Sequence, residues 1–282
     1  MPDGDFIDID WINRENNAPL VLILHGLEGS IDSHYAKGLL RAIALEGWRG
    51  AFIHFRGCSG EPNRLPTSYH SGATNDIQHI SHRLLQRAPN LPMAAIGFSL
   101  GGNVLLKWLG ETGKQNPLKA AIAISVPFEL RKTVLQIQSG FSKFYQQHLL
   151  KCVCRNLIKK FKAMPTSLID IAQLRQVKTM YALDDQITAP LHGFSGAEEY
   201  YATASSRQYL HAIQVPTLIL HAKDDPLVSE NAIPNPSELG TTVQLELSKA
   251  GGHVGFVSGP SPWRAEYWLE QRAIRFLRES LA

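Results

Sequence analysis

Short apolar segments alternate along the chain with longer segments whose apolar residues recur at helical spacing. The middle apolar segments are continuously hydrophobic, which is typical of strands covered on both faces of a parallel sheet. We predict strands at residues 6–12, 20–26, 50–55, 93–98, 120–125, 217–222 and 243–248. We predict helices at residues 35–47, 74–88, 101–112 and 262–281. This alternation predicts an α/β fold with a mostly parallel, doubly wound sheet.

One long interval breaks the alternation. Between the strands predicted at 120–125 and 217–222 lie roughly 90 residues without a convincing strand pattern. Residues 130–161 have instead the pattern of a helix that is interrupted near Gly140. Further helix is expected around residues 167–178 and 195–212.

An insertion of this length in a compact fold is usually a lid or cap over a site. The chain has 282 residues, of which 44% are hydrophobic and 19% charged, as expected for a globular protein with a sizeable core. We therefore predict one core, formed by residues 1–126 and 214–282, and a helical cap at residues 127–213 inserted between the strands at 120–125 and 217–222.

The strongest local motif lies in AIGFSLGGNVLLKWL, residues 95–109. Gly97, Ser99 and Gly101 match the pattern G-x-S-x-G between an apolar strand and an apolar-periodic helix. A sharp strand-to-helix turn of this kind exposes the serine hydroxyl, and the glycines are needed because a Cβ would clash there. The alternative is a glycine-rich turn with an incidental serine. The flanking strand and helix favour Ser99 as a nucleophile.

A serine needs a base to take its proton and an acid to hold that base. In the fold that uses this serine turn, the acid and then the histidine follow the serine in sequence. His253 lies in the glycine-flanked loop KAGGHVGF after the last predicted strand, where an imidazole can reach the nucleophile. Of the other histidines after Ser99, three lie in the predicted cap, namely His148, His192 and His211. His221 lies inside a strand, where a hydrogen-bonded core histidine is expected.

The acid must lie between the serine and the histidine in sequence, and also at the carboxyl end of a strand. Asp224 and Asp225, in HAKDDPLV, meet both conditions. Only the first condition is met by Asp184 and Asp185. Neighbouring residues at a strand end point in different directions, so at most one of Asp224 and Asp225 is expected to face the histidine. Spacing leaves both as candidates.

A glycine-rich turn after an early strand offers the groups for an oxyanion hole. LILHGLEGS, residues 22–30, ends an apolar run in the pair His25-Gly26. The backbone N–H that follows this pair, on Leu27, and the N–H of Leu100 after the serine can together be aimed at a developing oxyanion. A plain turn without this role is the alternative.

Metal-type residue spacings occur only as isolated pairs. His79 and His82, and also Cys152 and Cys154, have no further ligands beside them, whereas a zinc site takes three or four protein ligands. We therefore expect neither a metal nor an organic cofactor. With Cys58 the cysteines number three and form no disulfide framework, which favours a cytoplasmic location.

The net charge of +3 conceals an asymmetry. Residues 131–162 contain eight Lys or Arg and no acid, while the rest of the chain has 20 bases against 25 acids. This segment is either a solvated helix face or a patch that meets anionic lipid or an anionic substrate. No signature of a nucleic-acid-binding module is present. The longest apolar run, 18–24, is too short to span a bilayer, and the acidic start MPDGDFIDID does not have the pattern of a signal peptide.

Taken together, these motifs make the chain resemble the YheT-like branch of the α/β-hydrolase superfamily, which is related to the eukaryotic abhydrolase-domain lipid hydrolases. The likeness covers nearly the whole chain. It rests on DGDFIDIDW (3–11), LHGLEGS (24–30), HFRGCSGEPNR (54–64), YHSGATNDI (69–77), GFSLGGN (97–103), DDQITAPLHGF (184–194), HAKDDPLV (221–228) and GGHVGF (251–256).

The resemblance implies an α/β-hydrolase fold with Ser99 as nucleophile and His253 as base. The family's acid stands directly before the proline of its turn, which corresponds to Asp225. The family places the segment beginning at Asp184 in the cap connection, which favours a structural role there. Relatives usually carry an N-terminal extension before the motif that begins at Pro2, whereas this sequence starts there. The eighth, edge strand that such an extension would supply is therefore not predicted.

The resulting hypothesis is a serine hydrolase that cleaves carboxylic esters through an acyl-enzyme. Alternatives are a lipid-directed hydrolase or acyltransferase acting on medium-chain or anionic lipids, with peripheral membrane contact through the basic cap. A noncatalytic binding module that keeps the fold is a further alternative. The expected partners are a small-molecule ester or lipid, and no nucleic acid.

Overall fold

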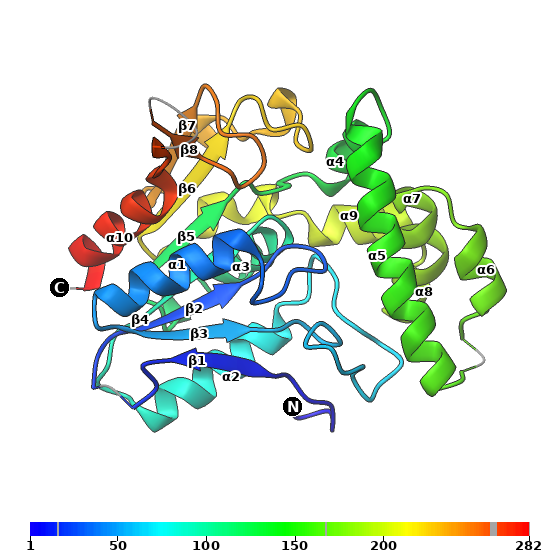
Figure 1. Cartoon of the computed structure of the whole chain (residues 1–282), viewed down its shortest axis with the longest axis horizontal. Coiled ribbons are helices and arrows are strands. Elements are labelled where there is room, and N and C mark those ends of the chain that lie inside the picture. The colour runs from blue at the N-terminus through cyan, green and yellow to red at the C-terminus, as the bar shows by residue number, and fades with distance from the viewer. Residues whose placement is uncertain (16, 167, 260–263, 282) are drawn as a thin grey trace.

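Seven strands form the central sheet of the protein (Figure 1). The computed structural model describes residues 1–15, 17–166, 168–259 and 264–281. The spatial order is β1-β3-β2-β4-β5-β6-β7, in which β1 is antiparallel to β3 and the other pairs are parallel. The strands are β1 (Ile9–Ile12), β2 (Leu20–Leu24), β3 (Arg49–Ile53), β4 (Met93–Phe98), β5 (Ala120–Ile124), β6 (Thr217–Ala222) and β7 (Val243–Ser248).

Helices cover both faces of the sheet, because its central strands are apolar on both sides. One face carries α1 (His34–Leu45) and α10 (Trp268–Leu281), and the other carries α2 (Asn75–Arg87) and α3 (Leu100–Thr112). Successive residues of β2 face opposite layers: Leu22 packs with the α2 and α3 side, and Ile23 packs with the α1 and α10 side. The predicted doubly wound α/β fold is confirmed.

The predicted strands are all observed, but the last helix begins later than predicted. It was expected over 262–281 and starts at Trp268. The two residues before it form β9 (Glu266–Tyr267), which pairs with β8 (Val257–Ser258) in a separate two-stranded sheet. Residues 266 and 267 therefore form strand hydrogen bonds, although their side-chain pattern predicted a helix. Residues 262 and 263 of the prediction lie outside the described residues.

Among the described residues between β5 and β6 there are six α-helices, α4 to α9, which we call the cap helices. Most of their buried residues form an apolar cluster separate from the two sheet layers. The predicted interruption near Gly140 is present, since Gly140 has φ 52° and one helix ends before it and another begins after it. The division into core and cap at 127–213 stays a prediction. The helices are α4 (Leu130–Ile137), α5 (Ser142–Ala163), α6 (Ile171–Gln176), α7 (Met180–Leu183), α8 (Ala189–Leu191) and α9 (Ala197–Ala204), with a π-helical turn at Asp184–Thr188.

The strand order places a site at the end of the sheet that the cap helices cover. Strand β2 has β3 on one side and β4 on the other, so the direction of winding reverses between β2 and β4. Ligands of open α/β sheets bind beyond the carboxyl ends of the strands at such a reversal. In Figure 1 the arrowheads of β2 and β3 point towards α5 and the other cap helices.

Candidate active site

Ser99 stands at a strained turn between β4 and α3. Its backbone has φ 49° and ψ −117°, a region that residues with a side chain rarely adopt. Two close approaches require glycine beside it. A Cβ on Gly97 would lie 2.5 Å from the Gly101 carbonyl oxygen, and a Cβ on Gly101 would lie 2.4 Å from that of His25. The predicted strand–turn–helix context of the serine is therefore present.

The side chains of Ser99, His253 and Asp225 form one hydrogen-bonded chain. Nε2 of His253 lies 3.0 Å from Oγ of Ser99, and its Nδ1 lies 2.8 Å from Oδ2 of Asp225. The other carboxylate oxygen of Asp225 accepts the Leu227 N–H at 2.9 Å. The Asp225 side chain is buried, whereas Ser99 and His253 are partly exposed. The three groups come from the ends of β4 and β6 and from the loop after β7.

Asp224 has a different role, which the sequence did not reveal. Its side chain is exposed and does not contact the imidazole. Its Oδ1 accepts the backbone N–H of Gly251 at 2.9 Å and that of Gly252 at 2.8 Å. These glycines directly precede His253, so Asp224 anchors the loop that carries the histidine. The two neighbouring acids thus both position His253: Asp225 contacts its ring, and Asp224 binds the backbone of the two residues before it.

The histidine loop is held at a second point. The Val254 N–H donates to Oγ of Ser125 at 3.1 Å, and the Phe256 N–H donates to the Gly251 carbonyl. Val254, Phe256 and Ser125 all have positive φ, between 46° and 59°. A residue with a side chain keeps a positive φ only where its surroundings fix it. Here the positive φ values occur both in the loop that presents the imidazole and at Ser125, which that loop contacts.

His221 lies behind the acid in the core. Its side chain is fully buried, with Nε2 3.9 Å from Oδ2 of Asp225. Among the described residues neither ring nitrogen has a hydrogen-bond partner, so the expectation of a hydrogen-bonded core histidine is wrong. Burial lowers the pKa of His221 to about 4, which leaves a neutral ring beside the acid.

The loop after β2 presents the predicted oxyanion group. Within the described residues, the backbone N–H groups of Leu27 and Leu100 make no hydrogen bond. The N–H groups on either side of Leu27 are both bound: that of Gly26 donates to the Tyr35 hydroxyl at 3.1 Å, and that of Glu28 donates to the Tyr69 hydroxyl at 2.9 Å. The loop is thus fixed on both sides of Leu27, whose N–H remains available.

His25 ties this loop to its neighbour. Its Nε2 accepts the Phe55 N–H at 3.0 Å, so its Nδ1 is the protonated nitrogen, 2.6 Å from the Gly26 carbonyl oxygen. Burial lowers the pKa of His25 to about 4, so the ring is neutral. Its role is to hold the loops after β2 and β3 together.

A cavity of about 260 Å³ adjoins these groups. Ser99, Leu100, Leu27 and His253 line it on the core side. The cap contributes a mostly apolar wall, which includes Leu130, Val134, Ile137, Leu149, Val153, Leu157, Met180, Leu183, Ile187 and Leu191. An apolar cavity with a few convergent polar groups is the usual form of a small-molecule site.

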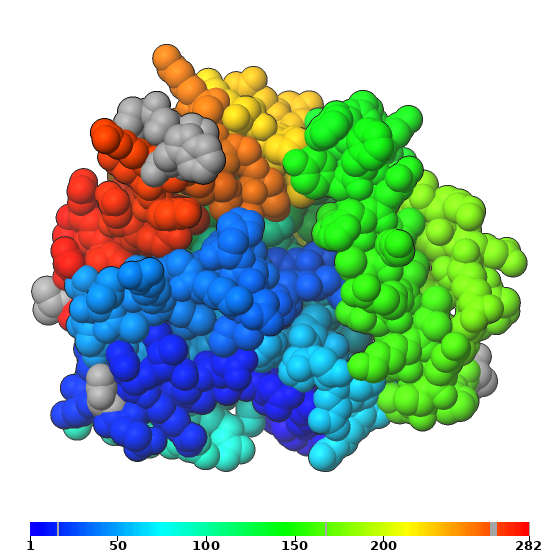
Figure 2. All heavy atoms as spheres, viewed as in Figure 1, coloured from blue at the N-terminus to red at the C-terminus, as the bar shows by residue number. Residues whose placement is uncertain are grey.

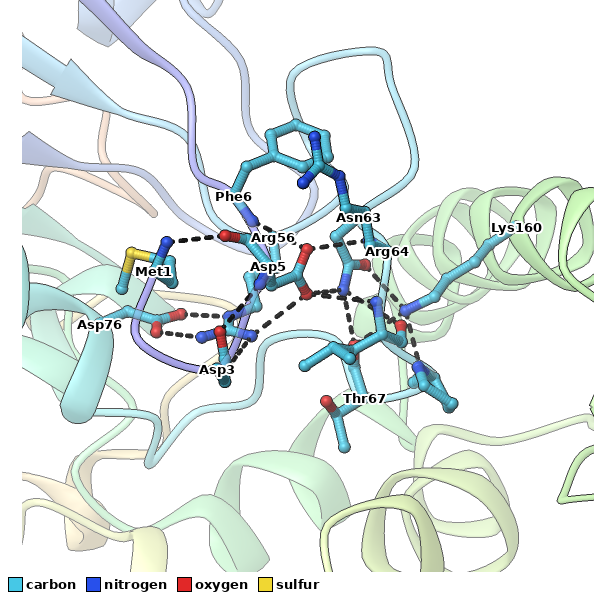
Figure 3. A network of polar contacts seen from close by, with 12 residues as sticks. Met1, Asp3, Asp5, Phe6, Arg56, Asn63, Arg64, Thr67, Asp76 and Lys160 are labelled. Carbon is cyan, nitrogen blue, oxygen red and sulfur yellow. Dashed lines mark hydrogen bonds and ion pairs between the residues drawn. The ribbon is translucent and has the colours of Figure 1, made fainter.

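Three of the residues that line the cavity, Arg56, Asn63 and Lys160, belong to a polar network (Figure 3). The Arg56 guanidinium contacts the carboxylates of Asp3, Asp5 and Asp76. Its hydrogen bonds to Asp76 and Asp3 raise its pKa. Asn63 donates to Asp5 at 2.6 Å. Arg56 lines the cavity, but its guanidinium is already engaged by three carboxylates.

Lys160 joins the cap to this network. Its Nζ donates to Oδ1 of Asn63 at 2.8 Å and to the carbonyl oxygens of Pro66 and Thr67, each at 2.9 Å (Figure 3). Burial lowers the pKa of Lys160 to about 8. All three N–H bonds of its ammonium group are used, so Lys160 fastens α5 to the core and has none left for a substrate.

Other buried groups on the cavity wall are also engaged. Asp184 accepts from the hydroxyls of Tyr201 at 2.8 Å and Thr188 at 3.0 Å, and burial raises its pKa to about 6. These contacts fit the structural role expected of it. Burial also raises the pKa of the Cys58 thiol, which disfavours the thiolate that a nucleophile would need.

Within the described residues, no group of three or more His, Cys, Asp or Glu side chains is arranged to hold a metal ion. In the same part of the chain, no helix is both long enough and apolar enough to cross a bilayer.

The α/β hydrolase fold family model matches residues 19–260. The chain is 43% identical to "Putative esterase YheT" of Escherichia coli K12 over 276 residues, which are 96% of this chain and 81% of that protein. It is 32% identical to the monoacylglycerol lipase of Saccharomyces cerevisiae, over 95% of this chain and 60% of the lipase. It is 29% identical to the phospholipase ABHD3 of Mus musculus, over 94% of this chain and 67% of that protein.

Solved structures agree on the fold. The esterase Pf2001 of Pyrococcus furiosus superposes with a TM-score of 0.64 at 18% identity, covering 99% of this chain and 88% of that one.

Proposed function

Because the chain belongs to the α/β-hydrolase fold family, in its YheT-like branch, and is an esterase- or lipase-type hydrolase, we propose that it cleaves carboxylic esters through an acyl-enzyme on Ser99. The observation that carries the proposal is the continuous chain of contacts from Asp225 through His253 to Ser99. The unoccupied N–H groups of Leu27 and Leu100 beside the same cavity support it.

In the proposed mechanism, Oγ of Ser99 attacks the ester carbonyl carbon while its proton passes to Nε2 of His253. Asp225 keeps the other ring proton on Nδ1 and stabilises the imidazolium. The N–H groups of Leu27 and Leu100 bind the tetrahedral oxyanion. Collapse breaks the bond to the alcohol oxygen, which takes the proton from His253. Water then attacks the acyl-enzyme by the same route, releasing the acid and restoring the serine.

Fluorophosphonate labelling tests the nucleophile. We expect the wild type to be labelled and Ser99→Ala not to be labelled. The matched control is Ser195→Ala, which removes an exposed serine hydroxyl that does not line the cavity and should leave labelling on Ser99. Labelling of Ser99→Ala at the wild-type rate, or no labelling of the wild type, would refute the assignment.

A second candidate is a lipid-directed hydrolase or acyltransferase. The apolar cap wall suits a medium acyl chain, and the similar proteins named above include a lipase and a phospholipase. A series of p-nitrophenyl esters separates the two: activity that peaks at acetate supports a short-chain esterase, and activity that rises to medium chains supports the lipid candidate. We also propose a cytoplasmic location, which the free Cys58, Cys152 and Cys154 support.

A further inference from the structure

The outer surface of the cap carries exposed aromatic rings. At the turn between α4 and α5, the side chains of Phe141, Phe144 and Tyr145 are 71%, 66% and 41% exposed. The ring centroid of Phe141 lies 5.4 Å from that of Phe144 and 6.1 Å from that of Tyr145. We call these three residues the aromatic apex. Grouped exposed apolar side chains of this kind mark interaction sites, whereas isolated ones are ordinary.

Basic side chains continue from the apex along the same helix. Lys151, Arg155 and Lys162 follow Phe144 at intervals of seven, four and seven residues, a spacing that puts all four on one face of α5. The three bases, which we call the basic stripe, are exposed and, in the part of the chain that is described, form no ion pair. Over its 22 residues α5 is about 33 Å long. Figure 2 shows α4 and α5 (green) as a ridge on the molecular surface.

Four of the other five bases of segment 131–162 show the contrast, and the fifth, Lys143, is an exposed neighbour of the aromatic apex. Arg131 pairs with Glu198 and Lys132 with Glu129, while Lys159 and Lys160 donate to oxygens of the core. No acid lies within the segment to neutralise the stripe. Basic charge beside exposed aromatic rings is complementary to an anionic lipid surface, where the rings sit at the headgroup level and the cations meet the headgroups.

We propose that the aromatic apex and the basic stripe dock the protein on an anionic lipid surface. The inner face of the same helix lines the cavity through Val153 and Leu157, so docking brings the wall of the proposed site next to the lipid. The reason for docking, which is access to a substrate, rests on the proposed function. The binding to lipid itself needs no catalysis.

Vesicle sedimentation of the Ser99→Ala protein tests docking without hydrolysis. The probes are vesicles of phosphatidylcholine alone and of equal parts phosphatidylcholine and phosphatidylglycerol, in about 0.1 M and about 1 M salt. We expect binding to the anionic vesicles only, and its loss at high salt. Lys151→Gln/Arg155→Gln should lower the partition coefficient roughly 30-fold, at roughly fivefold per base. Phe141→Ser/Phe144→Ser should weaken binding to the anionic vesicles at the lower salt concentration.

Matched controls remove similar groups elsewhere. Lys114→Gln/Lys119→Gln removes two exposed bases and Tyr267→Ser removes an exposed ring, and neither should change binding. The docking proposal would be overturned if the apex and stripe variants bind the vesicles as well as Ser99→Ala does. It would also be overturned if Ser99→Ala does not bind the vesicles, or if it binds RNA instead of vesicles. The proposed function is tested separately, by fluorophosphonate labelling of Ser99 in the wild type. Failure of docking and failure of the proposed function are therefore distinguishable.

A second, independent observation concerns the loop that carries Leu27. Glu28 has φ 55°, and its N–H donates to the Tyr69 hydroxyl, which in turn donates to Oε1 of Glu28 at 2.8 Å. The other carboxylate oxygen of Glu28 accepts from the side-chain amide of Asn156, on α5. Burial raises the pKa of Tyr69, so its hydroxyl stays protonated and fills both roles. These contacts fix the peptide that follows Leu27.

We infer that Tyr69 and Asn156 are positioning residues for the Leu27 N–H, acting through Glu28. Asn156 belongs to the cap, so the oxyanion group would be fully ordered only with α5 in place. An oxyanion donor stabilises the transition state more than the bound substrate, so its misplacement lowers kcat and leaves KM nearly unchanged. This inference rests on the proposed function.

Kinetics of Asn156→Leu and Tyr69→Phe test the inference, with enzyme concentrations set by active-site titration. We expect kcat to fall roughly 10- to 100-fold, less than the 10²–10³-fold loss of a whole donor, and the rate of fluorophosphonate labelling to fall in parallel. Gln147→Leu, an exposed position on α5, and Tyr209→Phe, a half-buried tyrosine whose hydroxyl donates to the Thr203 carbonyl, are the matched controls.

A purely structural role for these residues would lower the melting temperature or raise KM without changing kcat. Wild-type kcat in both variants, or such a KM effect alone, would overturn the positioning role. A wild type that is not labelled would refute the proposed function instead.

Discussion

Replacing Asp225 with asparagine tests the acid of the proposed triad most directly. The carboxylate accepts the Leu227 N–H on one oxygen and contacts Nδ1 of His253 on the other. An asparagine that keeps the first contact through its oxygen turns its NH2 group towards Nδ1. The ring must then carry its proton on Nε2, where it cannot accept the proton of Ser99. We expect kcat to fall about 10⁴-fold, or about 5.5 kcal/mol at 1.36 kcal/mol per decade.

The neighbouring acid provides the matched control. Asparagine at 224 keeps an oxygen that can accept from Gly251 and Gly252, so Asp224→Asn should cost no more than about threefold in kcat. Asp224→Ala removes both contacts, each worth about 0.5–1.5 kcal/mol, and frees the loop before His253. We expect it to lower kcat about tenfold.

The assay is hydrolysis of a p-nitrophenyl ester across pH, with thermal unfolding to check that each variant is folded. The ordering wild type, Asp224→Asn, Asp224→Ala, Asp225→Asn, from fastest to slowest, supports the geometry. If Asp224→Asn is as slow as Asp225→Asn, or if Asp225→Asn keeps more than a tenth of wild-type kcat, the assignment of the acid is wrong.

Three further predictions concern packing, substrate range and pH. Gly101→Ala should destabilise the fold by several kcal/mol, seen as a fall in melting temperature, because its Cβ would meet backbone at 2.4 Å; an unchanged melting temperature would contradict the crowding. Val153→Phe narrows the cavity, so activity on long-chain esters should fall while activity on acetate stays within about twofold; equal loss on both would count against this wall as the acyl site. The pKa of Asp184, raised from 3.8 to about 6, means that the folded protein holds this proton more tightly than the unfolded chain does. Its contribution to stability is therefore complete below about pH 4 and is lost as the pH rises through about 6, so Asp184→Asn should flatten that part of a plot of melting temperature against pH, and an unchanged slope would refute the reasoning.

The sequence predicted those parts of the fold whose patterns are local. Continuous apolar runs identified the strands, and the spacing of glycines around Ser99 identified the turn, because both are dictated by neighbours in the chain. The helices at 180–183 and 189–191 and the π-helical turn between them were not predicted. They are too short for a periodic pattern, and the cap cluster rather than propensity stabilises them.

The contacts that position the site were harder to predict from the sequence than the catalytic residues themselves. Physical reasoning left Asp224 and Asp225 equivalent, and only the resemblance separated them before the contacts could be measured. The anchoring of Gly251 by Asp224, and the contact of Asn156 with Glu28, join residues more than 25 and more than 120 positions apart. Such pairs leave no periodic trace in one sequence, because their proximity follows from the tertiary fold.

The attachment of α5 has a consequence for chimaeric enzymes. Ser142 donates to the Pro226 carbonyl beside the acid loop, Asn156 contacts Glu28, and Lys160 fastens the helix to the core. A transplanted cap that lacks these three donors would leave acceptors on the core without partners, whatever shape its inner wall has. Substrate range is therefore better redesigned by exchanging single inward positions and keeping the helix, with the most direct choices being Leu149, Val153 and Leu157.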